Sequence, residues 1–163
     1  MSGPLRRVTR TAEQTEALGA ALACALPAGG PLLVAHLHGD LGAGKTTLVR
    51  GLLQQLGHAG AVRSPTYTLF ETYEVGGHSV LHADLYRLQD PDELENLGLR
   101  DFAAPGWVWL VEWPQKGAER LPAADLRLDL AVIDAGHVIE LCGQTPAGEH
   151  WLAGLVGTGQ SQA

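Results

Sequence analysis

Apolar residues recur at helical spacing in the first part of the chain. Leu18, Leu22 and Leu26 are each four residues apart, so they share one face of a helix. The preceding segment Thr11-Ala12-Glu13-Gln14 fits a capping box, in which the Thr and Gln side chains satisfy free backbone N–H groups. The pattern predicts a helix over residues 12–26.

A buried strand and a second helix are expected next. Residues 32–37 form a nearly continuous apolar run, which is typical of a strand covered on both faces. Helical spacing then returns from about Gly44, and Gly57 stands where helices often end in glycine. The apolar face of this helix consists of Leu48, Val49, Leu52, Leu53 and Leu56.

Short strands dominate the rest of the chain. Two segments rich in aromatic and β-branched residues, 66–74 and 78–85, predict a hairpin. A short acidic helix at 92–97 and a buried strand at 107–111, which ends at Glu112, follow. The remaining expected elements are a hairpin formed by 126–133 and 137–141, a helix at 146–156 and a frayed tail at 157–163. Early alternation of helices and strands, followed by hairpins, predicts one α/β domain with a mixed sheet over residues 1–163.

Composition narrows the class of protein. The chain has 163 residues, 45% of them hydrophobic, which is enough for one packed core. We expect no signal peptide, because no apolar stretch follows Arg6 and Arg7, and no bilayer-spanning run. Cys24 and Cys142 are too far apart to suggest a disulfide framework or a metal motif. A cytoplasmic protein without membrane contact is expected.

The net charge argues against nucleic-acid binding by this chain alone. Eleven Lys and Arg residues against 18 Asp and Glu residues give a formal charge of −7. A domain that grips nucleic acid unaided needs a basic surface to neutralise phosphates. Action on nucleic acid through a partner stays open.

A glycine-rich motif lies between the strand at 32–37 and the second helix. Gly39-Asp40-Leu41-Gly42-Ala43-Gly44-Lys45-Thr46 matches the pattern G-x-x-x-x-G-K-[ST]. Such glycines let backbone N–H groups point at phosphate oxygens, and the helix N-terminus adds its positive dipole end. Lys45 is expected to reach the β- and γ-phosphates and the Thr46 hydroxyl to bind Mg²⁺. The motif predicts a nucleoside triphosphate site in a P-loop NTPase fold of three layers, α/β/α.

Magnesium at such a site needs a carboxylate at the end of a strand. Asp84 closes one expected strand and Glu112 ends another, so both are expected at the carboxyl edge of the sheet, near the metal or the attacking water. Ser64-Pro65-Thr66 lies before Asp84, where switch proteins sense the γ-phosphate, and Thr66 is therefore a further candidate.

Other functions have weaker support. A GTPase would need an Asn-Lys-x-Asp segment, whereas the only asparagine is Asn96 and it is followed by leucine. A small-molecule kinase stays open, because Arg87 and Arg100 could serve in a lid.

The histidines and tryptophans have alternative interpretations as well. His36 and His38 share a strand face, but no third ligand for zinc lies nearby in sequence. Trp113 could pack in the core, cover the nucleotide or anchor a partner.

Motifs in order along the chain resemble those of one family. They are residues 39–48, Ser64-Pro65-Thr66-Tyr67-Thr68-Leu69, His82-x-Asp84-Leu85-Tyr86-Arg87-Leu88, Glu93-Leu94-x-x-Leu97-Gly98 and Glu112-Trp113-Pro114. Together, over about residues 11–141, they resemble the bacterial TsaE (YjeE) family. The resemblance implies a small Mg-ATPase required for threonylcarbamoyladenosine in tRNA, working with the TsaB–TsaD heterodimer, which would hold the tRNA.

The resemblance also implies roles for individual residues. The loop from Gly39 to Thr47 would hold the phosphates, and Thr46 with Glu112 would hold Mg²⁺. Asp84 and Thr66 would help position the metal and the hydrolytic water, and Thr11 would lie near the adenine. Family members often carry an arginine where this chain has His137.

Two functions follow from the resemblance. In the first, hydrolysis of ATP drives turnover of the TsaB–TsaD complex. In the second, the chain is a nucleotide-gated interaction module of that complex, and hydrolysis is incidental.

Overall fold

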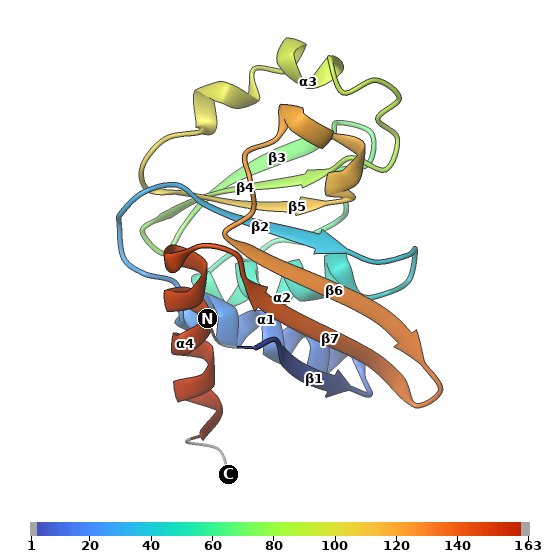
Figure 1. Cartoon of the computed structure of the whole chain (residues 1–163), viewed down its shortest axis with the longest axis vertical. Helices are drawn as coiled ribbons and strands as arrows, with labels where there is room; N and C mark the ends of the chain where they lie inside the picture. The colour runs from blue at the N-terminus through green and yellow to red at the C-terminus, as the bar shows by residue number, and fades with distance from the viewer. Residues whose placement is uncertain (1–2, 161–163) are drawn as a thin grey trace.

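A mixed sheet forms the centre of the molecule. The computed structural model describes residues 3–160, and within them seven strands pair in the order β1-β7-β6-β2-β5-β4-β3 (Figure 1). The strands are β1 (Leu5–Thr9), β2 (Leu33–His38), β3 (Phe70–Val75), β4 (His78–Asp84), β5 (Trp107–Glu112), β6 (Leu126–Ile133) and β7 (Gly136–Gly143). β6, β2, β5 and β4 run parallel, whereas β7, β1 and β3 join in antiparallel pairs. The predicted α/β class and mixed sheet are confirmed.

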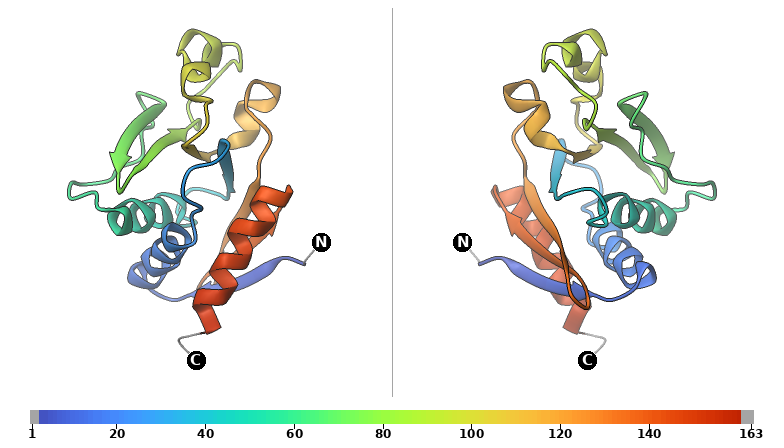
Figure 2. Two further views of the ribbon diagram at one scale, coloured as in Figure 1. Left: turned by 90° about the vertical axis from the view of Figure 1, so that its left-hand side faces the viewer. Right: turned by 90° about the vertical axis from the view of Figure 1, so that its right-hand side faces the viewer.

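The long helices cover one face of this sheet. α1 (Ala12–Cys24), α2 (Lys45–Leu56) and α4 (Pro146–Gln160) pack there, as the views in Figures 1 and 2 show. Leu22 and Leu52 are buried in the core beneath them. The Trp151 indole N–H donates a hydrogen bond of 3.0 Å to the Leu22 carbonyl and ties α4 to α1.

The opposite face carries shorter segments. They are α3 (Glu93–Asn96) and the 3-10 helices η1 (Leu99–Phe102), η2 (Pro114–Lys116) and η3 (Ala118–Arg120). Leu94, Leu99 and Leu121 are buried on this side in one cluster with Val34 and Trp109 of the sheet. The second helical layer expected from the sequence is therefore reduced to single turns.

α1 and α2 pack so closely that their backbones are in contact, which holds α2, the helix after the glycine-rich loop, against α1. A Cβ atom at Gly19 would lie 2.0 Å from the Leu48 carbonyl oxygen, and one at Gly51 would lie 2.0 Å from that of Glu16. Because real Cβ contacts are longer, glycine is required at both positions for this spacing.

The element boundaries depart from the expectations in several places. β1 was not predicted, and β3 begins at Phe70 rather than at residue 66, because residues 66–69 turn and the Leu69 N–H donates to the Pro65 carbonyl at 2.7 Å. α1 ends at Cys24, before Leu26. α4 continues to Gln160, past the expected end at residue 156, and the remainder of the expected tail, 161–163, lies outside the described residues.

The helices and the two cysteines can be compared with the expectations about membranes and disulfides. Within residues 3–160, none of the helices has both the length and the apolar character needed to cross a bilayer. Cys24 is exposed, Cys142 is half-buried, and both are free thiols.

Candidate functional site

The glycine-rich loop joins the carboxyl end of β2 to the first turn of α2. Gly42 and Gly44 have φ values of 82° and 105°, in the left-handed region that glycine adopts without strain. Gly44 is the N-cap of α2, and its carbonyl accepts the first helical hydrogen bond from Leu48 N at 3.0 Å. The loop therefore lies at a helix N-terminus, where the positive dipole end favours anions.

Lys45 is buried at the start of α2 and faces the loop. Its Nζ donates hydrogen bonds to the carbonyls of Gly39 and, at 3.1 Å, Asp40. The same ammonium lies 4.4 Å from the centre of the Trp113 ring, a cation–π contact. Burial lowers the pKa of Lys45, and the carboxylate of Glu112 is the largest opposing influence. The amine is thus held inside the site by neutral partners.

Glu112, the last residue of β5, faces Thr46 of α2. The Thr46 hydroxyl lies 3.1 Å from Glu112 Oε1 and 3.0 Å from Oε2 and donates to the carboxylate. Glu112 is 2% exposed, and its Oε2 also lies 2.6 Å from His82 Nε2 of the neighbouring strand β4. A hydroxyl and a carboxylate are hard oxygen ligands of the kind that Mg²⁺ prefers.

Asp84 ends β4 directly beside Glu112 in the sheet register. Its Oδ2 accepts hydrogen bonds from the hydroxyls of Ser64 and, at 3.4 Å, Thr66, and its Oδ1 accepts from the Tyr86 backbone N–H at 3.0 Å. The segment that contains Ser64 and Thr66 is thus fastened to the strand-end carboxylate.

These groups surround one cavity of about 340 Å³. It is lined by Ala12, Thr15, Leu41, Gly42, Ala43, Gly44, Lys45, Thr46, Thr47, Ser64, Thr66, Asp84, Tyr86, Glu112, Trp113 and His137. Gly39, Asp40 and Thr11 from the sequence-based set do not line it. Gly39 and Asp40 contribute the carbonyls that hold Lys45, and Thr11 caps α1 by accepting from Gln14 N at 3.1 Å.

Several residues at the cavity were not singled out from the sequence. Ala12 and Thr15 bring α1 to the cavity wall, and Tyr86 packs against Trp113 with ring centres 5.1 Å apart. His137 of β7, noted in the sequence only as the position where family members often carry an arginine, lines the cavity as well, and its Nδ1 is buried without a hydrogen-bond partner among residues 3–160.

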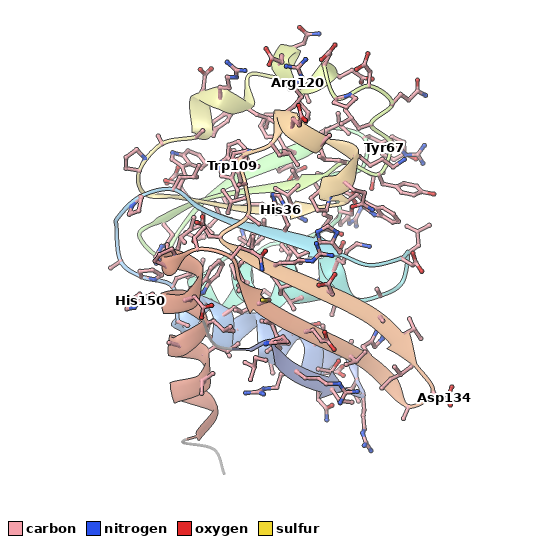
Figure 3. All side chains as sticks on the ribbon, viewed as in Figure 1. His36, Tyr67, Trp109, Arg120, Asp134 and His150 are labelled. Atoms are coloured by element: carbon pink, nitrogen blue, oxygen red, sulfur yellow. The ribbon has the colours of Figure 1, made fainter. Side chains whose placement is uncertain are left out.

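Two large side chains are exposed in the segments that contribute to the cavity: Leu41, which lines it, and Tyr67, which follows the lining residue Thr66. Leu41 is 64% exposed, and Tyr67 is 85% exposed with the Arg87 guanidinium 4.7 Å from its ring centre. Figure 3 shows Tyr67 on the side of the molecule toward which β2 points, while Asp134 marks the tip of the β6–β7 hairpin.

His36 and His38 lie apart from this cavity lining, on the other face of β2. Their ring centres are 6.4 Å apart, His36 Nε2 lies 3.2 Å from the Pro122 carbonyl, and burial lowers the pKa of both imidazoles. Within residues 3–160, no three His, Cys, Asp or Glu side chains gather in an arrangement that could hold a metal ion.

The fold and the cavity together define a class of protein. It is an α/β protein in which a glycine-rich loop joins a central parallel strand to a helix, and two strand-end carboxylates lie beside that loop. Residues 9–148 match the family model described as "Threonylcarbamoyl adenosine biosynthesis protein TsaE". The chain belongs to the TsaE family, which confirms the resemblance found in the sequence.

Individual relatives agree with this membership. The tRNA threonylcarbamoyladenosine biosynthesis protein TsaE of Haemophilus influenzae is 49% identical over 118 residues, 72% of this chain and 75% of that protein. The protein of the same name from Bacillus subtilis is 40% identical over 124 residues, 76% of this chain and 74% of that protein. The crystal structure of B. subtilis YdiB matches with a TM-score of 0.71 and 30% identity, covering 96% of each chain.

Proposed function

We propose that this chain is a Mg²⁺-dependent ATPase that acts in the biosynthesis of threonylcarbamoyladenosine in tRNA. The observation that carries the proposal is the pairing of the Thr46 hydroxyl with the Glu112 carboxylate beside the glycine-rich loop. Membership of the TsaE family and the printed names of the relatives support the role in tRNA modification.

The loop would hold the phosphates of the nucleotide. Its glycines and the start of α2 supply backbone N–H groups and a positive dipole end, and Lys45 supplies a full positive charge. When phosphates bind, the Lys45 amine would exchange the carbonyls of Gly39 and Asp40 for phosphate oxygens, which are stronger partners because they are charged.

Thr46 and Glu112 fit a magnesium ion shared with the phosphates. Mg²⁺ is commonly bound through one or two carboxylates together with substrate phosphates rather than by a cage of protein ligands. When bound, the ion would neutralise charge on the phosphates while the terminal phosphoryl group is transferred to water. Glu112 and Thr46 would hold their oxygens in place for it, because each already orients the other.

Asp84 and Thr66 would position the attacking water. Asp84 has two carboxylate oxygens at the cavity, and one of them is already fixed by the Tyr86 N–H. The other accepts from Ser64 and Thr66, so a water molecule that enters could take the place of a hydroxyl as donor. Such ordering contributes to phosphoryl transfer by orientation.

Partners complete the proposal. In it, ATP hydrolysis by this chain drives turnover of a TsaB–TsaD heterodimer in the cytoplasm, and that heterodimer holds the tRNA. The net charge of −7 supports indirect contact with tRNA. The exposed Leu41 of the cavity lining and the exposed Tyr67, which follows the lining residue Thr66, support contact with a protein.

A second function is supported by the hydrogen bonds of the Ser64–Thr66 segment. Because this segment is fastened to Asp84, a nucleotide that displaces it would change the surface offered to a partner. The chain would then be a nucleotide-gated interaction module in which hydrolysis is incidental.

Hydrolysis assays separate these functions and the small-molecule kinase. Phosphate release is measured for the purified chain alone and with TsaB–TsaD and tRNA, and stimulation by the pair is expected. Absence of stimulation, with phosphate appearing on an added small acceptor, would instead support the kinase. Glu112→Ala should bind ATP without hydrolysing it, and Glu119→Ala, at an exposed position, is the matched control. If Glu112→Ala still supports tRNA modification, the interaction module is correct.

A further inference from the structure

His82 is a fully buried polar residue behind the candidate magnesium ligand. Its side chain is 0% exposed, and its Nε2 lies 2.6 Å from Glu112 Oε2. With Glu112 ionised, this contact forms only when Nε2 carries a hydrogen and donates it, because a carboxylate is an acceptor. The hydrogen bond therefore requires a hydrogen on Nε2.

The sheet register explains how His82 reaches Glu112 from behind. β4 and β5 are parallel neighbours, in which His82 pairs with Leu110 and Asp84 pairs with Glu112. His82 and Asp84 lie on the same face of β4, since successive side chains alternate between faces. His82 is thus set back by two residues from the carboxyl edge, while Thr46 contacts Glu112 from α2.

Packing alone does not account for a histidine here. Its Nδ1 is buried and has no hydrogen-bond partner within the described part of the chain. A buried polar atom without a partner is destabilising, whereas an apolar side chain would fill a site in the core without that cost. The hydrogen bond to Glu112 is the contact that distinguishes histidine from leucine at this position.

We propose that His82 is a positioning residue for the magnesium ligand Glu112. Its Nε2–H holds Oε2 of the carboxylate and thereby sets the orientation in which Glu112 and Thr46 face the phosphates. The inference rests on the proposed function, in which Glu112 binds Mg²⁺. Groups that orient metal ligands by hydrogen bonds typically change metal affinity by about 10–100-fold when they are removed.

The test compares ATP binding with and without Mg²⁺ in His82→Leu and His82→Gln. Mg²⁺ is expected to increase ATP affinity, and the Mg²⁺ concentration that gives half of this increase is measured. In His82→Leu this concentration should be about 10–100-fold higher than in wild type. The ATP affinity of His82→Leu in EDTA should stay at the wild-type value. His82→Gln should restore most of the Mg²⁺ response, because the glutamine amide N–H can replace Nε2–H. His150→Leu is the control, at an exposed histidine on α4, on the other side of the molecule from Tyr67 (Figure 3).

Four results would contradict the positioning role of His82 or the function on which it rests. A wild-type Mg²⁺ response in His82→Leu, or an equal loss in both His82 variants, removes the positioning role. The ¹⁵N spectrum of the wild-type imidazole without nucleotide tests the pair independently of any variant, and hydrogen on Nδ1 instead of Nε2 overturns it. If ATP binding by the wild-type chain does not respond to Mg²⁺ at all, the proposed function itself fails, and this is distinguishable from the other results.

Discussion

Replacing Gly51 by alanine should force α1 and α2 apart. The new Cβ would lie 2.0 Å from the Glu16 carbonyl oxygen, whereas ordinary contact begins at 3.4 Å, so the helices must separate by about 1.4 Å if neither bends. Alanine gains about 1 kcal/mol of helix propensity over glycine. Overpacking costs about 1–3 kcal/mol, and the upper end or more applies here because the opposing atoms are backbone and cannot rotate away.

We therefore expect a net loss of about 2 kcal/mol in the free energy of unfolding, which corresponds to a fall of about 4–8 °C in Tm for a domain of this size. Urea unfolding followed by circular dichroism measures the free energy. Gln54→Ala, on the exposed side of α2, is the control and should change it by less than about 0.5 kcal/mol. A Gly51→Ala protein as stable as wild type would refute the inference that the two backbones touch.

Three further predictions concern the charge of Lys45, the half-buried carboxylate of Asp125 and the dependence of stability on pH. Lys45→Ala should lower ATP affinity by about 100-fold in calorimetric titrations, because it removes charged hydrogen bonds worth about 1.5–3 kcal/mol each, and unchanged affinity would show that the phosphates bind elsewhere. Asp125→Ala should cost about 1–3 kcal/mol in chemical unfolding, because the Val34 N–H loses its acceptor at 2.8 Å, and a cost below about 0.5 kcal/mol would contradict this. Because burial lowers the pKa of His36 and His38, the unfolded chain binds more protons, so the free energy of unfolding should fall as pH drops below about 6.5. His36→Gln should reduce that fall between about pH 7 and 5.5, and an identical pH profile would exclude His36 as its source.

The elements that the sequence predicted best are buried ones whose apolar pattern is complete within their own residues. β2 begins with the apolar run Leu33-Val34-Ala35, buried on both faces, and α2 has a continuous apolar face, so each carries its signal within one window. β1 lies at the sheet edge with arginines among its five residues, and edge strands need little apolar sequence. η1 is held by tertiary contacts of Leu99 with the sheet core, which no local window records.

In the candidate site too, some features were predictable from local sequence and others depend on tertiary structure. The loop is one contiguous motif, and the strand-end positions of Asp84 and Glu112 followed from the placement of their strands. That Ser64 would hydrogen-bond Asp84, and that His82 would lie behind Glu112, depends on the register of β4 against β5 and on a turn at residues 66–69. A histidine between apolar residues, in the run Val80-Leu81-His82-Ala83 of β4, was the signal that could have identified His82.

The cavity wall joins an early segment of the chain to a late one, and this determines when the site can exist during synthesis. Ala12 and Thr15 come from α1, whereas His137 comes from β7, which pairs with β1 near the end of the described fold. A chain still emerging from the ribosome therefore lacks one wall of the cavity until β7 has left the exit tunnel and taken its place in the sheet. A nucleotide that fills the cavity would bind the complete fold but not the partial one. By mass action it would therefore stabilise the protein only after β7 has joined the sheet.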